Sequence, residues 1–161
     1  MKLSPCAAIA LAFAADAAIV THARAEITFR HAVTGETLDF SYAKAGGDTE
    51  AFKKFKETGK NPYNGNKEVT ENKGHSLYLS ACSGCHGHEA EGKIGPGLAD
   101  DYWTYPRATL DVGLFEILFG GAQGSMGPQY VNLNTDEMLQ IMAWLRSVYK
   151  GDPAKAEWLK P

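Results

Sequence analysis

The sequence predicts an all-α protein with a short extended element near its start. Apolar residues recur at helical spacing in four segments, and capping residues or helix-terminating glycines mark several segment ends. Strand-like alternation is confined to residues 26–45. The length of 161 residues suits one domain of ordinary size. We therefore expect three to five helices around a single core.

Residues 1–25 are typical of a secretory signal peptide. Lys2 precedes an apolar run from Cys6 to Val20, and Ala23-Arg24-Ala25 forms a small-residue cleavage site before Glu26. The apolar run is too short to span a membrane. We therefore expect a processed chain that starts at Glu26, lies in the periplasm and has no membrane anchor. The chain is mildly acidic, with a net charge of −3 and no basic stripe, which argues against nucleic acid as a partner.

Residues 26–68 are predicted to form an N-terminal extension. Apolar residues alternate on both sides of Thr34-Gly35-Glu36, which indicates a short hairpin around a glycine turn. A helix follows from Thr49 to Thr58, with Asp48 or Thr49 as its cap and Gly59 at its end.

The most specific motif in the chain is Cys82-Ser83-Gly84-Cys85-His86. This C-x-x-C-H spacing is typical of c-type haem attachment, because two thiols about one helical turn apart can each add to one vinyl group of the porphyrin. His86, the next residue, then lies under the ring and can ligate the iron. We therefore expect one covalent haem c, attached through Cys82 and Cys85, with His86 as an axial ligand.

Other uses of this motif fit less well. A structural zinc site needs four ligands, usually in two spaced pairs, and the only other cysteine is Cys6. A thioredoxin-like motif would lie in a βαβ pattern, which this chain lacks. A plain disulfide between Cys82 and Cys85 would leave His86 without a role.

Residues 69–161 are predicted to form the haem domain. Its first helix, from about Glu71 to Ala81, places Gly74, Tyr78 and Cys82 on one face. Because glycine has no Cβ, Gly74 predicts a close approach to another helix.

The last helix of the chain is the expected partner. It begins with a capping-box sequence at Asn134–Glu137 and ends before Gly151. A further helix is predicted from Asp111 to Phe119. The apolar stripe of the last helix contains Met138, Ile141, Met142 and Leu145.

The second axial ligand must come from far along the chain, since it lies on the opposite haem face. The candidates are Met126, Met138, Met142, His31 and His75. Met138 and Met142 have the helical spacing of core methionines, His75 is expected to be exposed, and His31 belongs to the extension. Met126 stands alone in a glycine-rich loop before Pro128, so we predict Met126 as the ligand. A histidine ligand and an open position are the alternatives.

Pro96 has a predicted role beside the haem. Its carbonyl could accept a hydrogen bond from the second ring nitrogen of His86, which would fix the imidazole tautomer and strengthen the bond to iron. The alternative is an ordinary loop proline that ends a turn.

These motifs, in this order, resemble class I cytochromes c. The resemblance implies that fold, in which three to five helices surround one covalent haem. Longer blocks are similar to the cytochrome cL family, the periplasmic electron acceptors of quinoprotein methanol dehydrogenase in methylotrophic bacteria. The similarity covers nearly all of the chain after the leader. The blocks that carry it are Cys82–His88, Glu91–Leu98, Tyr102–Pro106, Asp111–Phe115, Phe119–Ala122 and Asp136–Gln140.

The resemblance implies an electron carrier and not an enzyme. Its haem would accept single electrons from a PQQ-dependent methanol dehydrogenase, of the calcium or the lanthanide type, and pass them to a downstream c-type cytochrome. The nearest alternative is a c-type cytochrome that accepts electrons from another periplasmic dehydrogenase. A haem peroxidase would need an open sixth position and usually a second haem, and a sensor module would need a signalling domain for which the chain has no room.

A docking surface can also be predicted from the chain. The exposed haem edge would be surrounded by residues 121–124 and by the aromatic block that contains Tyr102, Trp103 and Tyr105. A purely structural place for Trp103 is the alternative.

Overall fold

The computed structural model describes residues 27–160, and the predicted leader lies outside them. This part of the chain is helical and contains no strand longer than an isolated bridge. No helix in it is long and apolar enough to cross a membrane. The five α-helices are α1 (Glu50–Thr58), α2 (His75–Ala81), α3 (Ser83–His86), α4 (Asp111–Gly120) and α5 (Thr135–Ser147). Shorter helices are η1 (Phe40–Tyr42), the π-helical η2 (Val69–Gly74), η3 (Pro106–Thr109), η4 (Gln129–Val131), η5 (Pro153–Lys155) and η6 (Glu157–Leu159).

The predicted hairpin is present in reduced form. Arg30 and Thr37 form one antiparallel bridge, and Gly35 takes the left-handed conformation in the turn, with φ of 74°. The amide of Leu38 donates to the carbonyl oxygen of Phe29 at 3.0 Å. After this one bridge the chain continues into the short helix η1.

The helix α1 follows the sequence prediction closely. The Thr49 side chain accepts a hydrogen bond from the Phe52 amide, and Gly59 ends the helix with φ of 69°. Phe52 and Phe55 are buried while Lys53 and Lys54 face solvent. A side-chain cap and a left-handed glycine are local signals, so the sequence determines both ends of this helix.

Phenylalanines join the extension to α4. Phe55 and Phe115 have ring centroids 5.1 Å apart, and Phe40 meets Phe119 edge to face at the same separation. Edge-to-face contacts of this kind add to the free energy of apolar burial. The extension therefore contributes to one core shared with the haem domain. The members of this cluster are Phe29, Phe40, Phe52, Phe55, Phe115 and Phe119.

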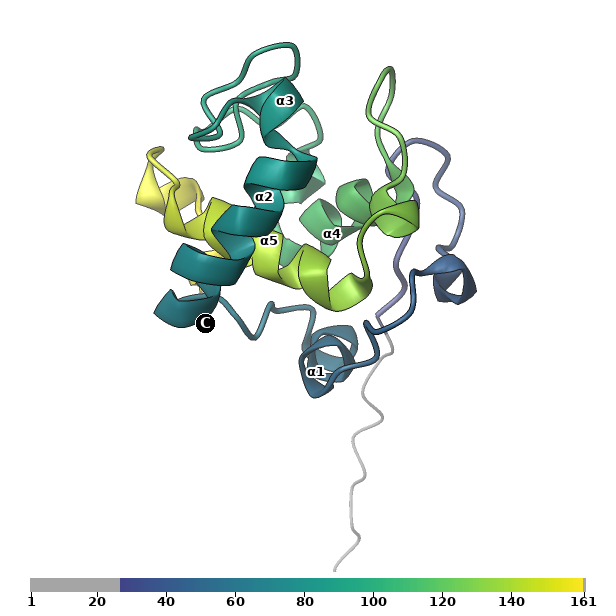
Figure 1. Ribbon diagram of the computed structural model, residues 1–161. Coiled ribbons are helices and arrows are strands. Elements are labelled where there is room, and N and C mark those ends of the chain that lie inside the picture. Colours follow the sequence, from purple (N-terminus) through teal and green to yellow (C-terminus); the bar gives the residue numbers. More distant parts are fainter. Residues whose placement is uncertain (1–26, 161) are drawn as a thin grey trace, which may run out of the picture.

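The helix predicted from Glu71 to Ala81 begins earlier and is irregular. It starts at Val69, and its first part, η2, is π-helical, with the His75 amide reaching the Thr70 carbonyl oxygen five residues back. A widened turn has no signature in a pattern of period 3.6. The predicted close approach at Gly74 is confirmed, because η2 and α2 pack against α5 there (Figure 1).

The helix α5 has its predicted start and a different end. Asn134 and Glu137 form the capping box. The helix ends at Ser147, several residues before Gly151, which the sequence analysis took as the stop signal. Beyond this point the Lys150 amide donates to the Ala99 carbonyl oxygen at 2.7 Å, so a tertiary contact draws the chain out of the helix.

The helix α4 carries buried charges that tie the fold together. Asp111 and Arg146 pair at 3.1 Å, with only 3% of each side chain exposed. Glu116 accepts from the side chain of Arg107 at 2.7 Å and from the backbone amide of Arg30 at 2.8 Å. Each carboxylate thus joins α4 to a segment distant in the sequence.

Candidate haem site

The attachment motif forms a single helical turn directly after α2. The amides of Cys85 and His86 both donate to the Cys82 carbonyl oxygen, at 3.1 and 3.0 Å. Cys82 is half-buried and Cys85 is exposed, and the two thiols are not joined in a disulfide. Burial, followed by the proximity of Cys85, raises the pKa of the Cys82 thiol to about 11. Because no disulfide joins them, both sulfurs are available for thioether bonds.

The imidazole of His86 is held in one orientation. Its Nδ1 lies 2.9 Å from the Pro96 carbonyl oxygen, and the residue is 9% exposed. A carbonyl oxygen can only accept, so Nδ1 carries the proton and the lone pair of Nε2 is free to bind a metal. A Cβ at Gly95 would lie 2.7 Å from Cε1 of the ring. The chain can therefore pass this close to the imidazole only with glycine at that position.

Met126 lies in the loop between α4 and η4. Its side chain is half-buried and packs against the core. The Ala122 amide donates to the Met126 carbonyl oxygen at 2.9 Å, which closes the loop on itself. In Figure 1 this loop, in light green, projects from the same side of the molecule as α3, while α1 lies at the opposite end.

The other axial candidates have different surroundings. Met138 and Met142 are fully buried in α5 and fill the core. The Nδ1 atom of His31 accepts from the amides of Val33 and Thr34, at 3.1 and 3.2 Å. Among these candidates, Met126 is the one that lies in a partly exposed loop. Its role as the second ligand stays a prediction.

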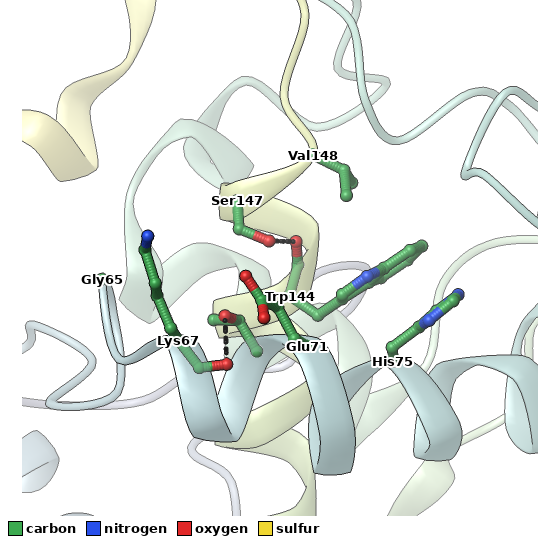
Figure 2. A pocket seen from close by; sticks show the side chains of 8 residues that line it. Gly65, Lys67, Glu71, His75, Trp144, Ser147 and Val148 are labelled. Carbon is green, nitrogen blue, oxygen red and sulfur yellow. Dashed lines mark hydrogen bonds between the residues drawn. The ribbon is translucent and has the colours of Figure 1, made fainter.

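His75 is not the exposed residue that the sequence analysis expected. Its ring stacks on Trp144, with centroids 4.8 Å apart and planes 10° apart, and its Nε2 is shielded from solvent. It lines a groove of about 570 Å³ between η2 and the end of α5 (Figure 2). The groove contains none of the predicted haem-site residues. Its lining consists of Gly65, Lys67, Thr70, Glu71, His75, Trp144, Ser147 and Val148.

Two aromatic residues of the predicted docking block have structural contacts. The Tyr105 hydroxyl accepts a hydrogen bond from the Gln123 amide at 2.8 Å. Trp103 packs on the core, and the Arg146 guanidinium lies over its ring, 5.4 Å from the centroid. Tyr102 is 68% exposed. Sequence reasoning missed the Tyr105 contact, because nothing local connects a tyrosine to a peptide amide 18 residues later.

The donor set fits a covalent haem. Two free thiols lie one turn apart, and the adjacent imidazole directs an unprotonated nitrogen away from its hydrogen-bonded side. A thioether from a separate loop is available as a further donor. Two thiols followed by an imidazole are the groups that attach and ligate a c-type haem, and a methionine thioether is a known second ligand.

The fold and sequence match known cytochromes. Residues 69–145 match the family model described as cytochrome C oxidase, cbb3-type, subunit III. The chain is 58% identical over 134 residues to cytochrome c-L of Methylorubrum extorquens strain AM1. The aligned region covers 83% of this chain and 68% of that protein.

Two solved structures are also similar. Cytochrome CL from the marine methylotrophic bacterium Methylophaga aminisulfidivorans superposes with a TM-score of 0.81 at 56% identity, covering 84% of this chain and 89% of that one. Cytochrome cL from Hyphomicrobium denitrificans superposes with a TM-score of 0.79 at 51% identity, and the match covers 84% of this chain and 82% of that one. The helical architecture is the class I cytochrome c fold. The chain therefore belongs to the cytochrome c-L family, whose members are electron carriers and not enzymes and carry one covalent haem c.

Proposed function

We propose that the protein accepts single electrons from a PQQ-dependent methanol dehydrogenase and passes them to a downstream c-type cytochrome. The observation that carries this proposal is the 58% identity to cytochrome c-L. A similar structure from a methylotrophic bacterium, at 56% identity, supports the same metabolic setting.

Four side chains would hold the haem, which supplies a one-electron couple when it is bound. Cys82 and Cys85 would attach the porphyrin, and His86 and Met126 would occupy the two axial positions. The Pro96 carbonyl oxygen, 2.9 Å from Nδ1, makes the His86 imidazole a stronger donor. A methionine ligand raises the reduction potential relative to a second histidine, which suits an acceptor.

Met126 in the axial position would also exclude side reactions. A filled sixth position leaves no site for oxygen or peroxide. The half-burial of Met126 against the core and the closed loop around it support this role.

We also propose that the chain after the leader consists of an N-terminal extension (26–68) and a haem domain (69–161).

Export is the remaining part of the proposal. Cleavage after Ala25 would release a periplasmic protein without a membrane anchor. Mass spectrometry of the purified product is expected to give a chain that starts at Glu26 and carries one haem, which acid acetone does not extract. An uncleaved chain in the membrane fraction would contradict the location.

The decisive experiment is reduction by a purified partner. The oxidised protein is mixed with methanol dehydrogenase and methanol, and its haem absorbance is followed in a stopped-flow spectrophotometer. We expect rapid reduction that requires both enzyme and substrate. A second periplasmic quinoprotein dehydrogenase with its own substrate serves as the comparison. Faster reduction by that enzyme would favour the alternative, an acceptor for a different dehydrogenase.

A further inference from the structure

A tyrosine outside the haem motif holds the loop that carries Met126. The Tyr105 hydroxyl accepts from the Gln123 amide at 2.8 Å, three residues before Met126. Among the described residues, no other hydrogen bond joins residues 123–125 to the rest of the protein. Among the described residues, this hydrogen bond is therefore the one that joins the exposed part of the loop to the body of the fold.

The loop contains two glycines in a backbone conformation that other residues rarely adopt. Gly121 and Gly124 both have positive φ, at 86° and 88°, and residues 123–125 are exposed. Glycine loses more backbone entropy on ordering than any other residue, so such a loop needs an external contact to hold one conformation. The hydrogen bond from Ala122 to Met126 closes the loop but does not fix its position relative to the core.

Tyr105 itself is firmly placed. Its carbonyl oxygen accepts from the Ala108 amide at 2.9 Å at the start of η3. The same short helix contains Arg107, which pairs at 2.7 Å with the buried carboxylate of Glu116 in α4. The hydroxyl is therefore presented to the loop from a segment anchored in the core.

We propose that Tyr105 is a positioning residue for Met126, and that its hydroxyl keeps the loop in the conformation that presents the thioether to the haem iron. This inference rests on the proposed axial role of Met126. Without the hydroxyl, water can satisfy the exposed Gln123 amide, so the fold survives. The loop then spends more time in conformations that withdraw the sulfur. Partners of this kind, beyond the ligands themselves, tune metal sites in many proteins.

The test compares Tyr105→Phe with Tyr102→Phe in the haem-loaded protein. Tyr102 belongs to the same aromatic block but is 68% exposed, and its hydroxyl makes no hydrogen bond among the described residues. Imidazole is titrated into the oxidised protein, because it binds iron only where the thioether has left. We expect Tyr105→Phe to bind imidazole roughly two- to tenfold more tightly, the factor that one net hydrogen bond supplies. The long-wavelength absorption band of thioether-ligated ferric haem should weaken in parallel, while the melting temperature changes little.

Equal imidazole affinities for Tyr105→Phe, Tyr102→Phe and the unaltered protein would overturn the inference. Met126→Ala separates this failure from failure of the proposed ligand. Loss of the thioether band in Met126→Ala supports Met126 as the ligand, whereas a retained band removes both claims. Hydrogen exchange measured by NMR on the unaltered protein gives an answer that does not depend on how the variant folds. The Gln123 amide should exchange more slowly than those of Gly124 and Ser125, and equal rates would contradict the contact.

Discussion

A Cβ built on Gly74 would lie 2.3 Å from the carbonyl oxygen of Gln140. This distance is far below van der Waals contact, and the obstructing atom belongs to the backbone of α5, which cannot rotate away. The approach of the two helices at this point depends on the missing side chain. It also brings Trp144 against Tyr78, with ring centroids 4.2 Å apart.

Gly74→Ala is therefore expected to destabilise the protein by roughly 1–3 kcal/mol, the usual range for overpacking. This loss occurs although alanine favours a helix by about 1 kcal/mol over glycine. Guanidinium unfolding of the haem-loaded protein measures the change. Ser76→Ala, at an exposed position of α2, is the control and should leave the unfolding free energy nearly unchanged. Equal stability of the two variants would show that the helices can separate without cost.

Asp111→Asn is predicted to cost roughly 3–5 kcal/mol of unfolding free energy, because it leaves the Arg146 guanidinium buried without a counter-charge. Asp111 Oδ2 also accepts from the Asn61 amide at 2.9 Å, so the change affects a link to the extension as well. Thermal and guanidinium unfolding both report the loss. The exposed pair of Glu50 and Lys53 provides the contrast, and Glu50→Gln should have no measurable effect.

The C-terminal segment should show a pH-dependent stability that depends on Asp101. Hydrogen bonds from the Tyr149 hydroxyl, then from Lys155 and the Asp152 amide, hold the pKa of Asp101 below its ordinary value of 3.8. Because the pKa is lowered by folding, this stabilisation is fully present above pH 3.8 and is lost as the pH falls through the folded-state value.

The unfolding free energies of the unaltered protein and Asp101→Asn should consequently differ most at neutral pH and converge in acid. Urea unfolding over a series of pH values measures the difference. Glu57→Gln, an exposed change on α1, should track the unaltered protein throughout. A gap of constant size at every pH would mean that the carboxylate charge is not what holds the segment.

Gln123→Arg and Ser125→Arg are expected to slow electron uptake from methanol dehydrogenase by about tenfold, if the dehydrogenase docks over the Met126 loop. Both side chains are exposed, and neither change removes the Gln123 amide that binds Tyr105. The haem spectrum and melting temperature should stay the same. Glu57→Arg places a positive charge on α1 at the opposite end of the molecule (Figure 1) and should leave the rate unchanged. Unaltered rates in both loop variants would place the docking surface elsewhere.

Local signals in the sequence were sufficient for much of the fold. Thr49 and Gly59 mark the ends of α1, and the Asn134 capping box marks the start of α5, because each acts on backbone groups within a few residues. The spacing of Cys82, Cys85 and His86 is also a local signal, because haem attachment requires these residue types at this spacing. Gly74 was informative for a different reason, since a helical glycine facing an apolar stripe has few uses other than close packing.

What the sequence did not reveal depends on partners distant in the chain. The ion pair of Asp111 with Arg146 and the hydrogen bond of Tyr105 with Gln123 span 35 and 18 residues, and no periodicity encodes them. His75 was expected to be exposed because it lies next to the face that carries Gly74, yet its ring stacks on Trp144, 69 residues further along the chain. The early end of α5 has the same origin, a contact between Lys150 and Ala99.

The phenylalanines of the extension find their partners late in the chain. Phe29 packs on Phe115, and the amide of Arg30 binds Glu116, 86 residues further on. The N-terminal residues of a newly made chain appear first, so this aromatic core cannot close until α4 has followed. By that time Cys82 and Cys85 have already appeared. The order of residues along the chain thus keeps both thiols accessible for thioether formation while the core is still open.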